Sequence, residues 1–158
     1  MAVVDLLNLK AALARQSRLL GLDVGSKTIG LAISDSSLRV ASPLSTIRRE
    51  KFATDAQEIN QIIAERGIGG LVIGLPIAMD GSEGPRCQSV RQFGANLLGV
   101  IDLPVAFWDE RFSTIGANRP LHEAEMSHRR RANVIDKLAA AYILQGALDR
   151  LANLGPPA

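Results

Sequence analysis

Residues 18–35, RLLGLDVGSKTIGLAISD, form the stretch around which the fold of this chain is predicted. An apolar run at residues 19–22 ends on Asp23, the chain turns through residues 24–27, and a second apolar run follows at residues 28–33. Two such runs around a short glycine-containing turn predict a β-hairpin. An unpaired carboxylate costs free energy when it is buried, so the acid at the end of a core strand needs a reason to be there. Either Asp23 accepts backbone hydrogen bonds at its own turn, or it holds a cation at the end of a sheet.

The rest of the chain alternates helix and strand patterns. Strands are predicted at residues 39–48, 69–76 and 103–108, and helices begin at Thr54, at Arg86 and near Ala132. Pro43 places the first of these strands at an edge or a bulge. The alternation predicts an α/β fold in which helices cover a mixed sheet of five strands.

Several residues mark the ends of the predicted helices. Thr54 and Gln57 have the spacing of a capping box, and Gly67 ends the helix that they begin. Residues 1–17 predict a short amphipathic helix outside the main fold, with Asp5 as its N-cap. We therefore expect three parts: an N-terminal extension at residues 1–17, one domain at residues 18–152 and a disordered tail at residues 153–158.

Composition limits the classes of protein to which the chain can belong. Cys87 is the only cysteine, so there is no internal disulfide, and no Cys/His cluster has zinc-ligand spacing. The N-terminus lacks a signal-peptide pattern and no apolar run reaches transmembrane length, so we expect a soluble, cytoplasmic protein. The net charge is only +2, but residues 111–137 contain six basic residues against three acids. This uneven distribution is compatible with a nucleic-acid partner and does not require one.

Three acids are predicted to meet in the folded chain. Asp23 ends the first strand, the strand at 103–108 runs into Asp109 and Glu110, and Asp136 is the single charge on the apolar face of the last helix. Because side chains alternate along a strand, only one of Asp109 and Glu110 faces Asp23, and the pattern leaves open which one. Three carboxylates repel one another when no cation is bound. Two Mg²⁺ or Mn²⁺ ions bound among them would give the whole site a net charge of about +1. Such a two-metal site suits phosphodiester hydrolysis.

Four pieces of the chain resemble motifs of the YqgF/RuvX family, the Holliday junction resolvase or pre-16S rRNA nuclease family of bacteria. In chain order they are LLGLDVGSKTIGLAISD, LVIGLPIAMDGSEGP, WDERFST and VIDKLAAAYILQ, and the similarity covers about residues 18–151. The resemblance implies a ribonuclease H-like fold in which Asp23, Glu110 and Asp136 are catalytic, metal-binding acids. It also implies a cytoplasmic, metal-dependent role in maturing the 5′ end of 16S rRNA. Lys137 departs from the pattern, since many members have a small residue there.

Polar and basic residues near these acids are candidates for substrate binding, and each also has a structural interpretation. The hairpin turn residues equally suit ordinary turn chemistry, Arg86 equally suits a first-turn helix residue facing water, and Arg111 equally suits an ion pair with a neighbouring acid. The arginine run equally suits a solvated basic loop. The candidates are Ser26, Lys27, Arg86, Arg111, Arg129, Arg130 and Arg131.

Three functions follow from these patterns. The first is a metal-dependent nuclease acting on structured RNA, with pre-16S rRNA or a pre-ribosomal particle as its substrate. The second is a resolvase of four-way DNA junctions that uses the same acids. We expect the chain to be a monomer or a homodimer, and a resolvase should be a symmetric dimer because it cuts two related strands. The third, of another class, is a nucleic-acid-binding or ribosome-associated factor without catalysis. RNA and DNA are told apart by contacts to the 2′-hydroxyl, which residue types alone do not reveal.

Overall fold

The computed structural model describes residues 3–113 and 128–153, and at residues 113 and 128–133 it describes the backbone alone. Five strands form one sheet in the order β3-β2-β1-β4-β5. Their bounds are β1 Arg18–Val24, β2 Thr28–Ser34, β3 Ala41–Arg48, β4 Ile68–Leu75 and β5 Val105–Asp109. β1 pairs with β2 in antiparallel register and with β4 in parallel register, and β4 pairs with β5 in parallel register. The predicted hairpin and the predicted mixed five-stranded sheet are both confirmed.

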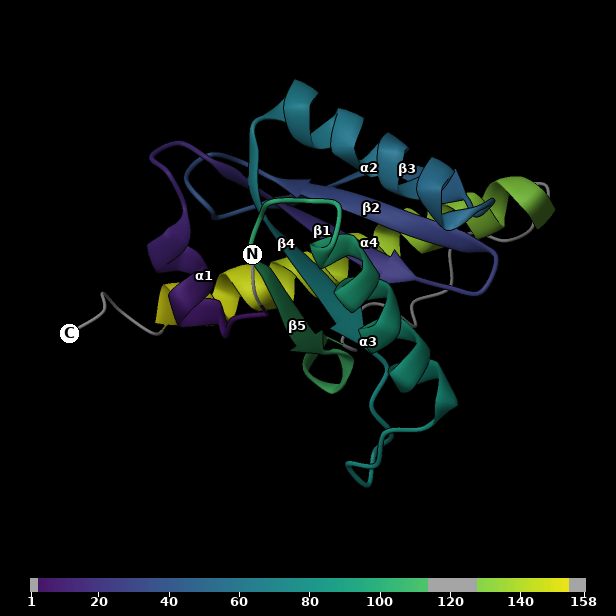
Figure 1. Cartoon of the computed structure of the whole chain (residues 1–158). Coiled ribbons are helices and arrows are strands. Elements are labelled where there is room, and N and C mark those ends of the chain that lie inside the picture. The colour runs from purple at the N-terminus through teal and green to yellow at the C-terminus, as the bar shows by residue number, and fades with distance from the viewer. Residues whose placement is uncertain (1–2, 114–127, 154–158) are drawn as a thin grey trace.

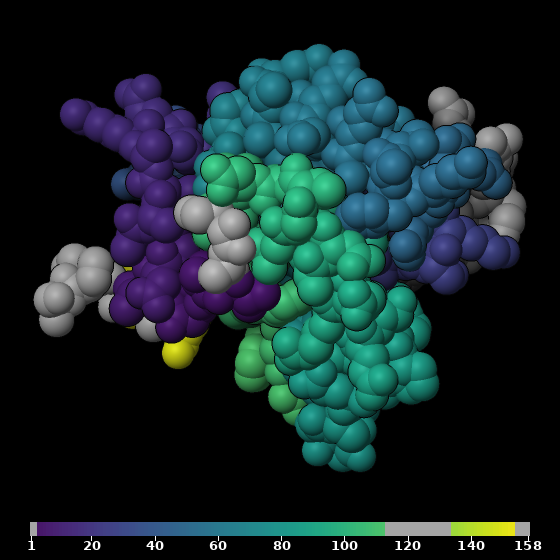
Figure 2. Space-filling model, in the orientation of Figure 1, coloured from purple at the N-terminus to yellow at the C-terminus, as the bar shows by residue number. Residues whose placement is uncertain are grey.

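Helices cover both faces of this sheet (Figure 1). α2 (Phe52–Arg66) and α3 (Pro85–Leu98) pack on one face, and the long α4 (His128–Asn153) crosses the other. Each face of the sheet has its own hydrophobic core, and β1 contributes side chains to both because they alternate along the strand. Leu20 and Leu22 are buried toward α2 and α3, whereas Leu19 is buried toward α4. Figure 2 shows α2 and α3 covering the nearer face, with the loop between β4 and α3 projecting beyond it. None of the described helices has the length and apolar character needed to cross a membrane.

The N-terminal helix packs against the main fold, contrary to our expectation that it lies outside. α1 (Leu6–Ala12) begins after the predicted N-cap, since the Asp5 side chain accepts a hydrogen bond of 2.8 Å from the Asn8 amide. Leu9 is fully buried in the same core as α4. Just before the helix, Val3 forms a parallel bridge with Val105 on the outer side of β5. The leucine spacing therefore reports a packed face, which stabilises the helix by burial.

The ends of other elements test the sequence signals. β3 is an edge strand, and its register with β2 shifts between Leu31 and Ala32, which faces Pro43, as the proline predicted. Gly67 ends α2 in the left-handed conformation, as predicted. The capping box at Thr54 is wrong, because α2 already begins at Phe52. Phe52, the first residue of the helix, packs edge-on against Phe93 of α3, a tertiary contact that no local pattern contains.

α4 starts at His128, a turn earlier than the predicted start near Ala132. Its predicted apolar face is confirmed, since Ala140, Ile143 and Ala147 are all buried against the sheet. Close contact between α4 and the sheet depends on glycine in the strands. A Cβ atom on Gly21 would lie 2.8 Å from the Cβ of Leu144, nearer than such atoms approach in proteins.

Candidate active site

Asp23 and Asp136 are brought together by the close passage of α4 over the hairpin. Asp23 lies near the end of β1 and pairs in register with Gly30 of β2. A Cβ atom on Gly30 would lie only 2.0 Å from the carbonyl oxygen of Asp136, so the helix backbone occupies the space above this glycine. The Thr28 hydroxyl donates a hydrogen bond of 2.6 Å to Oδ2 of Asp136 and fixes the direction of this carboxylate.

Glu110 reaches the same side of the sheet from the end of β5. It opens a short 3₁₀ turn, Glu110–Ser113, directly after the strand. A Cβ atom on Gly74 would lie 3.1 Å from both Cγ and Oε2 of Glu110 and 2.6 Å from Cδ1 of Ile143 of α4. The glutamate therefore lies across β4 on the α4 side, where Asp23 also lies, and the glycine leaves room for it.

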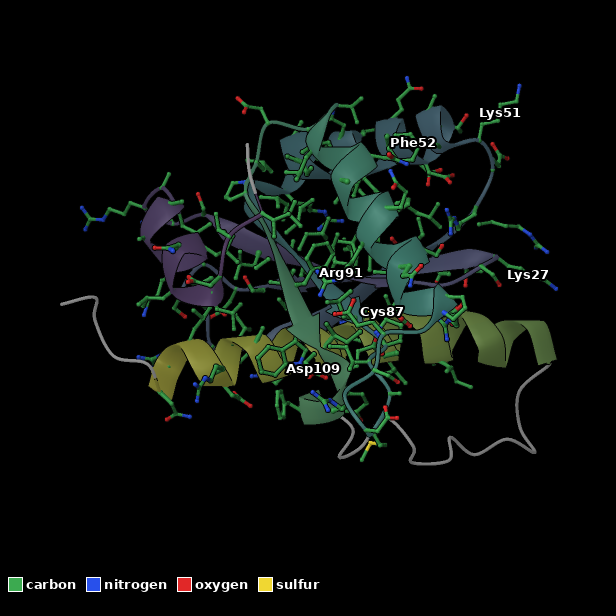
Figure 3. The ribbon with its side chains drawn as sticks, turned by 60° about the horizontal axis from the view of Figure 1, so that its bottom comes forward. Lys27, Lys51, Phe52, Cys87, Arg91 and Asp109 are labelled. Carbon is green, nitrogen blue, oxygen red and sulfur yellow. The ribbon has the colours of Figure 1, made fainter. Side chains whose placement is uncertain are left out.

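Asp109 has a different environment from its neighbour. Alternation places it with Phe107 on the side of α2 and α3, and Figure 3 shows it at the end of β5. Its carboxylate accepts hydrogen bonds from the Arg111 guanidinium, the shortest at 2.6 Å, and this partner lowers the pKa of Asp109. Of the two adjacent acids, the structure thus leaves Glu110 facing Asp23 and engages Asp109 in an ion pair.

The acids on the α4 side are buried and repel one another, and a nearby cation compensates this only in part. Burial, followed by the negative charge of Asp136, raises the pKa of Asp23 to about 6. Burial, followed by the charge of Asp23, raises the pKa of Glu110 to about 7. In both cases Arg86 acts in the opposite direction, so its guanidinium lies close enough to be felt by both acids. Asp23 therefore interacts with both other acids: the charge of Asp136 acts on Asp23, and the charge of Asp23 acts on Glu110.

A divalent cation fits the chemistry of these three side chains. They offer carboxylate oxygens, the ligands that Mg²⁺ and Mn²⁺ prefer, and their mutual repulsion is the condition that a cation relieves. Within residues 3–113 and 128–153, no three His, Cys, Asp or Glu side chains converge closely enough to enclose an ion as they stand. The side chains of Asp23, Glu110 and Asp136 would therefore have to move closer together to bind a metal ion.

The predicted substrate-binding residues have several positions. Ser26 and Lys27 are exposed at the β1–β2 turn, where Figure 3 shows Lys27 extending away from the hairpin. Arg86 is exposed in the first turn of α3, near the acids. Arg111 is held by Asp109. The side chains of Arg129, Arg130 and Arg131 lie outside the described residues, although their backbone belongs to α4.

Three residues of this region were missed by the sequence interpretation. Thr28 holds Asp136 from 108 residues away in sequence, which no local pattern reveals. Gly30 was treated only as part of an apolar strand, although a glycine inside a strand signals close approach of another backbone. Arg49 donates a hydrogen bond of 2.7 Å to the carbonyl oxygen of Gly25 and so supports the turn beside Asp23.

The chain is similar to a described protein family and to curated relatives along most of its length. The family described as "RuvX: Holliday junction resolvase" matches residues 17–150. Two relatives named "Putative pre-16S rRNA nuclease" come from Paramagnetospirillum magneticum and Roseobacter denitrificans. The first is 60% identical over 141 residues, covering 89% of this chain and 91% of the relative. The second is 57% identical over 153 residues, covering 96% of this chain and 94% of the relative.

Two solved structures share the fold at low sequence identity. RuvC of T. thermophilus, solved in complex with a Holliday junction substrate, has a TM-score of 0.55 and 13% identity, covering 88% of this chain and 96% of that one. The yeast mitochondrial Holliday junction resolvase Ydc2 has a TM-score of 0.54 and 11% identity, covering 92% and 83%. Both likenesses confirm the predicted ribonuclease H-like architecture.

Proposed function

The chain belongs to the RuvX family, and on this premise we propose that it is a divalent-metal-dependent nuclease that hydrolyses phosphodiester bonds in the cytoplasm. The observation that carries the proposal is the set of Asp23, Glu110 and Asp136 on one side of the sheet, with raised pKa values at the first two. Structural acids are ordinarily paired with cationic side chains, so acids left to repel one another are typical of a functional site.

The proposed substrate is precursor 16S rRNA, as the names of the curated relatives suggest. A four-way DNA junction is the second candidate, because the description of the family names that substrate. Both would use the same three acids. The two candidate functions would differ only in how the chain binds the nucleic acid around the cleaved phosphate.

Each site residue has a role that follows from its surroundings. Asp23, Glu110 and Asp136 would hold Mg²⁺ or Mn²⁺, and the metal would lower the pKa of an attacking water and neutralise negative charge on the leaving group. Thr28 is a positioning residue, because its hydroxyl fixes the Asp136 carboxylate by a hydrogen bond. Arg86 provides positive charge beside two of the acids, where it can orient an anionic phosphodiester.

Two cleavage assays under the same Mn²⁺ concentration test this proposal. A precursor 16S rRNA fragment and a synthetic four-way DNA junction are each incubated with wild-type chain and with Asp23→Asn, Glu110→Gln and Asp136→Asn. We expect metal-dependent cleavage of the rRNA by wild type and its loss in all three variants. Preferred cleavage of the junction would select the second substrate. Binding without cleavage of either substrate, or full activity in all three variants, would overturn the proposal.

A further inference from the structure

A small cavity lies at the outer end of the hairpin, on the face of the sheet opposite to the acids. Its volume is about 60 Å³, and it is bounded by the β1–β2 turn, the chain after β3 and the start of α3. Its apolar wall is Val24, the residue after Asp23, together with Val90. Its polar lining comes from four side chains: Ser26, Arg49, Arg86 and Ser89.

Arg49 is held in place by a carbonyl oxygen and an aromatic ring. Its guanidinium donates to the Gly25 carbonyl oxygen at 2.7 Å and lies over the Phe93 ring, 5.1 Å from its centre. Its backbone amide donates to the carbonyl oxygen of Lys27 at 2.9 Å. A guanidinium has five donors, so this geometry fixes the group while leaving donors for a ligand.

The cavity favours an anion. Two arginines and no acid line it among the described residues, and the ion pairs found there, Arg91–Glu83 and Arg111–Asp109, include neither Arg49 nor Arg86. Ser89 and Arg86 belong to the first turns of α3, so the positive end of the helix dipole faces the same region. Two guanidinium groups with hydroxyl donors match the oxygens of a phosphate.

The position of the cavity relates it to the acids. Asp23 and Val24 are neighbours on β1 whose side chains point to opposite faces, so the acids and the cavity flank the end of one strand. Arg86 lines the cavity and is felt by both Asp23 and Glu110. A nucleic-acid strand that crosses the end of β1 would therefore pass both the acids and the cavity.

We propose that the cavity of Ser26, Arg49, Arg86 and Ser89 binds the phosphate next to the cleaved one and sets the register of the strand over the acids. The proposal rests on the nucleolytic function proposed above and adds to it a second, metal-independent phosphate site. Arg49 and Ser89 become substrate-positioning residues under this proposal.

Binding of inorganic phosphate to the full chain tests the site without requiring cleavage. ¹⁵N-labelled protein without divalent metal is titrated with phosphate while the amide signals of Ser26 and Ser89 are followed by NMR. We expect saturable shifts at both residues. Arg49→Gln should weaken binding about tenfold, the loss of one charged hydrogen-bonding partner. Ser89→Ala, at an exposed position that does not hold the turn, should weaken it about threefold.

Arg48→Gln is the matched control, because it removes the same charge from the adjacent, exposed residue of β3, which does not line the cavity. It should change phosphate affinity less than twofold. No saturable shift at Ser26 and Ser89, or equal weakening by Arg48→Gln and Arg49→Gln, would overturn the proposal.

Cleavage of modified substrates then separates this proposal from the proposed function. In a substrate that wild type cleaves, one neutral methylphosphonate beside the cleaved bond should raise KM for wild type about tenfold and have little further effect in Arg49→Gln. An equal rise in KM on the methylphosphonate substrate for wild type and Arg49→Gln would overturn the proposed phosphate site. Phosphate binding with no cleavage of any substrate would overturn the nuclease and support the anion site.

Discussion

The carboxylates on the two sides of the sheet have opposite electrostatic environments. On the side of α2 and α3, Asp109 and Glu83 are paired with Arg111 and Arg91, and these partners lower the pKa of both acids. On the α4 side, burial and mutual repulsion raise the pKa of Asp23 and Glu110. The difference separates the acids that the fold pairs with arginines from the acids to which we assign the metal.

The same contrast separates two acids that are neighbours in the sequence. Asp109 and Glu110 are consecutive, yet Asp109 ends β5 and Glu110 opens the 3₁₀ turn, and their environments differ in charge partner and in burial. A family motif that contains both acids therefore has one structural member and one member at the proposed site. Each of the following experiments changes one side of the comparison and leaves the other intact.

Removal of charge from each side should have very different effects on cleavage. Asp23→Asn or Glu110→Gln should lower kcat about 10³-fold or more, because each removes an anionic oxygen from the proposed metal site. Asp109→Asn should lower it less than tenfold. The comparison uses single-turnover rates with saturating Mn²⁺, and circular dichroism establishes that each variant folds. Equal losses in Asp109→Asn and Glu110→Gln would remove the distinction between the two sides.

Gly30→Ala should displace the helix that carries Asp136. The added methyl group overlaps the Asp136 carbonyl oxygen, so α4 must move or the strand must bend, at a cost of about 3 kcal/mol in the free energy of unfolding. Chemical denaturation measures this loss, and cleavage should fall with it. Gly84→Ala is the control, since a Cβ there meets no atom within 4 Å. A Gly30→Ala variant as stable and active as wild type would contradict the close approach of α4.

The pH dependence of stability without metal should have opposite signs on the two sides. The raised pKa of Asp23, about 6, means that its contribution to stability is complete below pH 4 and is lost as the pH rises through 6. Asp109, whose pKa is lowered by Arg111, contributes stability above pH 4 and loses it on acidification.

Two variants measured in EDTA at pH 8 therefore separate the acids. Asp23→Asn should raise the free energy of unfolding by about 1 to 3 kcal/mol, because it removes a repelled, buried charge. Asp109→Asn should lower it by about 1 kcal/mol, because it removes a partly exposed ion pair. Denaturation curves at pH 5 and pH 8 give both values. Destabilisation by Asp23→Asn at pH 8 would contradict the burial and repulsion that we assign to the Asp23 carboxylate.

Thr28→Val should have the smallest effect. It removes the hydrogen bond to Asp136 and leaves the side-chain shape nearly unchanged, so stability should fall by about 1 kcal/mol. Mn²⁺ affinity, measured by calorimetry, should weaken about tenfold, as expected for a group that orients a ligand. Thr28→Ser retains the hydroxyl and should behave as wild type. Equal affinities in Thr28→Val and Thr28→Ser would show that the hydroxyl does not position Asp136.

The sequence predicts the fold where local pattern and packing agree. The hairpin at Asp23, the edge position of Pro43 and the end of α2 at Gly67 are all set by residues close in sequence. α2 begins instead at Phe52, which packs on the distant Phe93, and the cap predicted at Thr54 does not start the helix. α4 begins early because arginine is a good helix former, so a polar segment can continue an apolar helix.

The site is predictable only in part, for a geometric reason. Asp23 and Asp136 could be named because each is a lone acid on an apolar surface. The choice of Glu110 over Asp109 required the direction of β5, and the roles of Thr28 and Gly30 required knowing where α4 crosses the hairpin. Such contacts join residues about a hundred positions apart, so no sequence window contains both partners.

The proposed metal site is tested most directly by the position of Mn²⁺ in crystals of the full chain soaked with the ion. We expect anomalous density touching Asp23 together with Glu110 or Asp136, on the α4 side of the sheet, with Asp109 still bound to Arg111. Density on Asp109, or ordered metal elsewhere with Asp23 unliganded, would contradict it.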